Sequence, residues 1–176
     1  VEDIVYEADA FEDKFLEMLR HDQEVLERLN KDWERENEDP KFDLFRHELE
    51  SELLDEEINP SKKMVLFSES VDTLTYLYNR LTEELGRTDV LMVTASNRNR
   101  LVKNIKENFD ANSEVKENRY NIIITSDVLA EGVNLHRSNV IVNYDSPWNA
   151  TRLMQRIGRV NRIGSCLLYT SDAADE

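Results

Sequence analysis

The sequence has 176 residues and a formal net charge of −15, with 22 basic and 37 acidic side chains, three scattered histidines and one cysteine. This composition excludes a disulfide framework and shows no ligand spacing for a metal site. There is no run of about eighteen apolar residues and no signal-peptide pattern, so we expect a soluble, cytoplasmic protein with no membrane partner.

The acidity is unevenly distributed along the chain. Residues 1–60 carry 7 Lys/Arg and 22 Asp/Glu, whereas residues 61–165 carry 15 and 12. The charge therefore belongs to the first third, and the remainder is mildly basic, which keeps a nucleic-acid partner open. The sequence begins with Val1 and reads as the middle of a domain, so we expect a fragment of a longer protein.

The first third is predicted to be helical. Apolar residues recur at spacings of three, four and seven over residues 11–33, which indicates an amphipathic helix with an acidic outer face. The Asp-Pro pair at 39–40 interrupts this pattern, and a second helical pattern follows over residues 42–54. We interpret residues 1–61 as an acidic helical connector. A regulatory or partner-binding role for this segment is the alternative.

From residue 62 the sequence predicts an α/β fold. Four short apolar runs are typical of parallel strands buried on both faces: Met64–Phe67, Val90–Val93, 121–125 and 139–144. Helical spacings between them cover residues 71–81 and 101–109, so strands and helices alternate around a parallel sheet. Ligands of such sheets gather beyond the carboxyl ends of the strands, here at residues 68–70, 126–135 and 145–149.

An arginine-rich helix is predicted after a capping residue, Asn149. At 100° per residue, its apolar face holds Leu153, Ile157 and Val160. The opposite face holds Gln155, Arg159 and Arg162, with Arg152 and Arg156 on the flanks. Residues 150–165 contain no carboxylate, so pairing within the helix cannot explain the arginines. Planar guanidinium groups suit phosphate oxygens, which indicates a phosphate-bearing ligand.

Three stretches resemble motifs of superfamily 2 helicases and translocases. "TSDVLAEGVNLH" and "YDSPWNATRLMQRIGRVNRIGS" resemble motifs V and VI, and "KMVLFSESVDTLTYL" resembles motif IV. The likeness covers about residues 62–165 and is greatest to the Snf2-type group, especially its bacterial members. It implies the second RecA-like domain of such a motor, with a parallel sheet flanked by helices and preceded by the acidic helical segment.

The resemblance also implies roles for individual residues. Arg159 and Arg162 match the motif VI arginines that reach the γ-phosphate of ATP held by a partner domain, and Gln155 matches the polar residue near the attacking water or phosphate. The end of motif V lies near the nucleotide, and its matching positions are Gly132 and Asn134. Positions that would contact the nucleic-acid backbone are Ser68, Thr125 and Ser126. An ATP-hydrolysing motor therefore would complete its site by closing a cleft between two RecA-like domains.

Two departures from the DEAD-box pattern favour a DNA track over an RNA track. Asn134 stands where many helicases have Asp, and Glu131 stands where DEAD-box proteins usually have Arg. An RNA helicase motor domain remains the alternative, as does a catalytically silent RecA-like module used for binding or scaffolding.

Two parts of an ATP site are missing from the sequence. It contains no G-x-x-x-x-G-K-[ST] loop and no acidic box after a buried strand. We therefore expect the ATP phosphates and Mg²⁺ to be held by the first RecA-like domain of the same polypeptide, and the fragment alone to be inactive.

The final eleven residues, CLLYTSDAADE, form an unusual tail. They back-translate to a nucleotide string that resembles the transposase adapter of sequencing libraries. We expect native sequence to end near Ser165 and residues 166–176 to lie outside the domain of residues 62–165.

Overall fold

The computed structural model describes residues 11, 14–35, 38–129, 133–160 and 167–170. The chain divides into two compact units, residues 1–40 and 41–176. The described part of the first unit forms helix α1 (Phe15–Arg35), in agreement with the predicted amphipathic pattern. Its apolar side chains are exposed, Leu26 at 65% and Trp33 at 82%. Among the described residues, no helix combines the length and apolar character needed to cross a bilayer.

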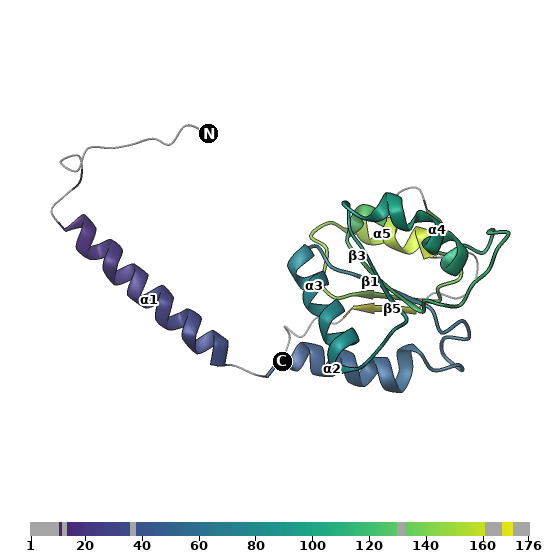
Figure 1. Cartoon of the computed structure of the whole chain (residues 1–176), viewed down its shortest axis with the longest axis horizontal. Helices are drawn as coiled ribbons and strands as arrows, with labels where there is room; N and C mark the ends of the chain where they lie inside the picture. The colour runs from purple at the N-terminus through teal and green to yellow at the C-terminus, as the bar shows by residue number, and fades with distance from the viewer. Residues whose placement is uncertain (1–10, 12–13, 36–37, 130–132, 161–166, 171–176) are drawn as a thin grey trace. The chain divides into compact units, whose positions relative to one another are not determined.

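The second unit is an alternation of helices and strands (Figure 1). Its helical elements are α2 (Pro40–Glu48), the π-helical turn η2 (Leu49–Leu53), α3 (Val71–Asn79), the π-helical turn η3 (Arg80–Glu84), α4 (Arg98–Phe109), the 3-10 turn η4 (Asp127–Leu129) and α5 (Ala150–Val160). Its strands are β1 (Met64–Phe67), β2 (Val90–Val93), β3 (Ile122–Thr125), β4 (Val140–Asn143) and β5 (Leu167–Thr170). The four predicted strands are confirmed, with β3 and β4 slightly shorter than their apolar runs.

The strands form one parallel sheet in the order β2-β3-β1-β4-β5. Side chains of β1 alternate between two cores, as the pleat of a strand requires. Met64 and Leu66 join the core under α2 and α3, whereas Val65 and Phe67 join the core under α4 and α5. Helices therefore cover both faces of the sheet (Figure 1), which explains why its strands are apolar throughout.

Helix α2 belongs to this unit and not to a connector. Phe42 and Phe45, at most 1% exposed, lie in the same core cluster as the sheet residue Leu66. The Phe45 ring packs edge-on against Tyr144, with centroids 6.0 Å apart. The predicted connector ended at residue 61, whereas the compact unit begins at Lys41. The acidic composition of this region reflects only the outer face of α2, whose inner face is apolar.

Strand β5 lies in the C-terminal tail. It pairs in parallel with β4, in a register that runs from Val140 opposite Leu167 to Asn143 opposite Thr170. Our expectation placed residues 166–176 outside the domain, whereas residues 167–170 of this tail form the fifth strand of the sheet. The adapter origin of the tail stays a prediction.

Lys63, immediately before β1, is a buried lysine with 1% of its surface exposed. Its ammonium donates to the carbonyl of Tyr120 at 2.7 Å and lies 4.9 Å from the centre of the Phe109 ring. Burial, and secondly the positive charge of Arg137, lower the pKa of Lys63 to about 8, against an opposing effect of Asp89. Removing water from the ammonium disfavours its charged form, so this lysine destabilises the fold whenever it is protonated.

We therefore expect the free energy of unfolding to rise with pH between about 8 and 10.5. In that interval the unfolded chain, whose lysine has an ordinary pKa, binds more protons than the folded chain, so raising the pH favours the folded state. The Lys63→Met variant should lose this part of the pH dependence. Urea unfolding of both proteins across this range measures it, and an identical slope in the variant would contradict the assignment to Lys63.

Candidate functional site

The carboxyl ends of β1, β3 and β4 lie side by side at one edge of the sheet. In the strand register, Phe67 stands opposite Thr125 on one side and Asn143 on the other. The pairing continues one residue further, because Ser68 N donates to Thr125 O at 3.1 Å and Tyr144 N donates to Phe67 O at 2.8 Å. The three loops predicted to carry the site therefore start next to one another.

Ser68 ties the first loop to the third. Its hydroxyl donates to the Asp145 carboxylate, which also forms an ion pair with Lys41 at 3.3 Å. Ser68 is fully buried. The same oxygen accepts a hydrogen bond from Ser70 N at 3.3 Å. The hydroxyl is thus engaged inside the protein, and the nucleic-acid contact at Ser68 stays a prediction.

The second loop begins with two hydroxyl residues that differ in burial. Thr125 is fully buried, and its hydroxyl bonds to Val93 O, with Ser126 O also 3.0 Å away. Ser126 is half-buried, and its carbonyl accepts from Leu129 N at 3.4 Å within η4. Of the two positions predicted to contact nucleic acid, Ser126 is the more accessible, whereas Thr125 joins β3 to β2.

Helix α5 begins at the third loop. The Asn149 side chain accepts from Thr151 N at 2.8 Å, which confirms the predicted cap. Gln155 is exposed and Arg159 is half-buried. The Arg159 carbonyl accepts from Leu135 N at 3.1 Å. This bond brings the segment of the half-buried Asn134 to the end of α5. Two other predicted site residues, Gly132 and Arg162, lie outside the described residues.

The main departure from prediction is Arg156. We placed it on a flank of the helix, but it is fully buried. Its Nε lies 2.6 Å from Asp127 Oδ1, and its Nη1 donates to Asn143 Oδ1 at 2.8 Å. Its guanidinium carbon lies 4.9 Å from the centre of the Phe67 ring. This arginine therefore binds the ends of β1, β4 and the loop after β3 to α5.

A second arginine of α5 reaches the same loops. Arg152 Nη1 lies 3.2 Å from Glu69 Oε1 and 3.4 Å from Asp127 Oδ2, with its side chain 54% exposed. The sequence contains no carboxylate within the helix, but the fold supplies two from the loops after β1 and β3. The absence of carboxylates within the helix therefore did not show that Arg152 and Arg156 lack protein partners, because both pair with loop carboxylates.

The buried end of this cluster has unused hydrogen-bonding capacity. Arg156 Nη2 and Asn143 Nδ2 have no acceptor among the described residues. A buried donor without a partner costs roughly 1–3 kcal/mol. A signal for Arg156 was available in the sequence, because it follows Leu153 by three positions and precedes Val160 by four. A residue at these spacings from the apolar residues of a helix shares their face.

Comparison with known proteins places this arrangement in a family. Residues 41–164 match the family described as "Helicase conserved C-terminal domain". The chain is 33% identical over 104 residues to "Probable ATP-dependent RNA helicase ddx51" of Dictyostelium discoideum, an alignment of 59% of this chain and 18% of that protein. It is 49% identical over 43 residues to "Uncharacterized ATP-dependent helicase YqhH" of Bacillus subtilis, which is 24% of this chain and 8% of that protein. The matches thus span less than a fifth of either relative.

A solved structure shows the same fold. S. cerevisiae Dbp5 bound to RNA and ADP BeF3 superimposes with a TM-score of 0.55 and 26% sequence identity, over 77% of this chain and 32% of that chain. This similarity confirms the predicted RecA-like sheet flanked by helices. Since the matched family covers well over half of the sequence and includes the three loops and α5, the chain belongs to the helicase conserved C-terminal domain family.

Proposed function

We propose that this chain is the second RecA-like domain of an ATP-dependent helicase or translocase. The observation that carries the proposal is the attachment of α5 to the ends of three strands through Arg156 and Asp127. This attachment fixes the helix at the sheet edge and leaves Gln155 exposed. The ATP dependence in the names of two relatives supports the same activity.

In this function Arg159 and Arg162 would stabilise the charge that develops on the γ-phosphate of ATP. Gln155 would lie near the attacking water or the phosphate, and Gly132 and Asn134 would lie near the nucleotide. The residues present fit half of a nucleotide site, because they offer guanidinium donors without a glycine-rich phosphate loop. ATP and Mg²⁺ would be held by the first RecA-like domain of the same polypeptide, across a cleft between the two domains.

The second part of the proposal concerns the nucleic acid along which the motor moves. Asn134 and Glu131 and the Snf2-like form of motifs V and VI favour DNA. RNA is the second candidate, because RNA is named in several relatives, including the Dictyostelium protein. Ser68, Thr125 and Ser126 are the proposed contacts in either case, and of these Ser126 is the one whose side chain is not fully buried.

We expect duplex or single-stranded DNA to stimulate ATP hydrolysis by the full-length protein, and the stimulation to fall steeply as salt rises, because phosphate contacts release counterions. Ser126→Ala should raise the DNA concentration for half-maximal stimulation by about tenfold, the loss of one hydrogen bond to a charged group. Ser113→Ala, beyond the end of α4, is the matched control and should change it little. Steady-state ATPase assays with DNA and RNA of equal length measure both effects. Stimulation by RNA alone would replace DNA with RNA as the track.

A further inference from the structure

The outermost strand β2 carries a groove that the proposed motor does not use. This edge groove, about 430 Å³ in volume, runs along β2, the outermost strand beyond β3. Its lining includes Val90 and Met92 of β2, together with Tyr78 of α3 and Leu101 of α4. Two strands, β3 and β1, separate β2 from β4, which precedes α5. The groove includes none of the residues predicted to bind nucleotide or nucleic acid.

The charge of the edge groove is wholly positive. Arg100 and Arg119 line it, both exposed, and its lining contains no carboxylate. Among the described residues neither guanidinium has an ion-pair partner, and Arg119 lies 5.3 Å from the centre of the Tyr120 ring. By contrast, the nearby Arg87 is held by both oxygens of Asp89, at 3.1 and 2.7 Å. The two groove arginines are thus available to a partner.

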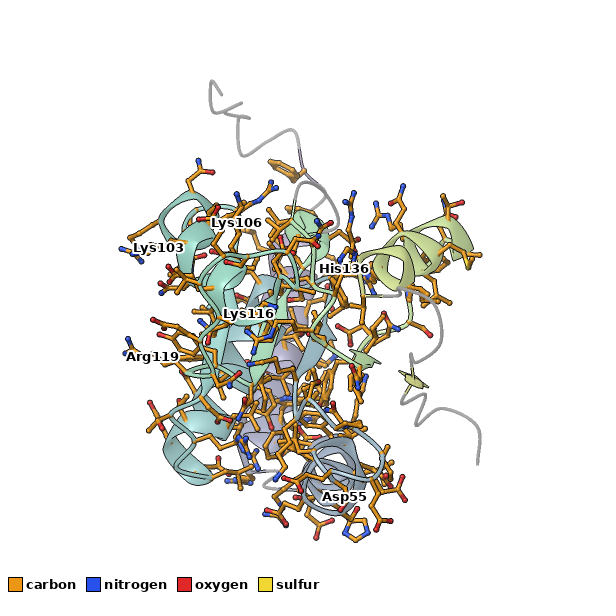
Figure 2. The ribbon with its side chains drawn as sticks, turned by 90° about the vertical axis from the view of Figure 1, so that its right-hand side faces the viewer. Asp55, Lys103, Lys106, Lys116, Arg119 and His136 are labelled. Atoms are coloured by element: carbon orange, nitrogen blue, oxygen red, sulfur yellow. The ribbon has the colours of Figure 1, made fainter. Side chains whose placement is uncertain are left out.

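Figure 2 shows where this charge lies on the surface. Arg119 points outward from the domain, on the side where Lys103 and Lys116 are also found. Neither lysine is part of the groove lining. The Lys103 side chain is 81% exposed. They therefore provide matched positions at which charge can be changed without altering the groove itself.

The backbone of β2 adds a second recognition element. Asn97 Nδ2 donates to Met92 O at 3.1 Å, so a side-chain amide already occupies this backbone acceptor of β2. A side-chain amide here takes the place of a neighbouring strand. Outermost strands of this kind accept extended peptides through main-chain hydrogen bonds, with flanking pockets selecting the alternate side chains.

We propose that the edge groove binds an extended acidic segment of a partner protein. Its backbone pairs with β2, its apolar side chains pack between Tyr78 and Tyr120, and its carboxylates pair with Arg100 and Arg119. Charge complementarity identifies the occupant, since a groove lined by two arginines and no acid, with Tyr78 and Tyr120 also in its lining, favours acidic residues that alternate with apolar ones. The two arginines alone would also suit phosphate oxygens, but an outermost strand offers main-chain hydrogen bonds that a peptide backbone completes and a phosphate chain does not.

The test is a selection of short random peptides against the full-length protein in the presence of competitor RNA. We expect the recovered peptides to be enriched in Asp and Glu alternating with β-branched or aromatic residues. Labelled with fluorescein, they should bind with dissociation constants that rise at least about tenfold in the Arg100→Glu/Arg119→Glu variant. The Lys103→Glu/Lys116→Glu variant carries the same charge change outside the groove and should shift binding no more than about twofold.

A further arm tests strand pairing. Replacing alternate peptide residues with proline removes backbone donors and should abolish binding if the peptide adds a strand to β2. Four results would overturn the proposal: no acidic enrichment, equal weakening by both charge variants, proline-tolerant binding, or binding of fluorescein-labelled RNA that depends on Arg100 and Arg119. Both arginines are exposed, so the variants should retain the wild-type melting temperature, and ATPase activity should be unaffected.

Discussion

Arg159→Ala in the full-length protein is expected to lower nucleic-acid-stimulated ATP hydrolysis on the order of 10³–10⁵-fold, the range known for arginine fingers. The reason is electrostatic: a guanidinium placed where charge develops in the transition state lowers the barrier without reorganisation. Nucleic-acid binding should be retained, because the contacts proposed for it lie at the ends of β1 and β3. Measuring turnover and binding on the same preparation separates the two effects.

The substitution is expected to leave the fold intact. The bond between Leu135 and Arg159 uses the Arg159 carbonyl, which alanine keeps. Met154→Ala is a matched control on the same helix, since Met154 is 65% exposed, and its turnover should equal that of the wild type. Unchanged hydrolysis in Arg159→Ala would remove the finger assignment. A wild-type protein that hydrolyses no ATP with any nucleic acid would instead favour the silent binding module.

Much of the fold could be predicted because its strands are buried on both faces. The runs at Met64–Phe67 and Val90–Val93 became strands without a shift of a residue, since nearly continuous apolar residues between polar loops have few other stable arrangements. The loops at the carboxyl ends followed from the parallel topology. The cap at Asn149 was equally local, because a cap depends on the next few residues alone.

What escaped prediction depends on partners that are distant in sequence. Arg156 stands 29 positions from Asp127, and helical periodicity cannot show which carboxylate will neutralise a buried arginine. The boundary of the domain was missed for a related reason. The acidic composition of residues 41–61 led us to assign Phe42 and Phe45 to a connector, whereas their burial depends on a sheet that follows them in the chain. Composition describes the outer face of a helix, whereas the inner face decides to which unit it belongs.

The burial of Arg156 leads to the second large effect, which is on stability. Asp127→Ala should lower the free energy of unfolding by about 3–5 kcal/mol, because it leaves a fully buried guanidinium without its carboxylate. The Asp127 side chain is 31% exposed, so water entering the site places the expectation toward the lower end. Glu69→Ala is the matched control. Glu69 pairs with the exposed Arg152, so its loss should cost no more than about 1 kcal/mol.

A double-mutant cycle separates the ion pair from the packing around it. If the charge left behind dominates the cost, Asp127→Ala combined with Arg156→Met should be more stable than the sum of the two single effects predicts. Urea unfolding with an unchanged m-value measures all three variants. Additive losses would mean that Asp127 acts independently of Arg156. Coupled losses would mean that α5, and with it Arg159, is held in place by a charge pair between the loop after β3 and the helix that carries the arginines.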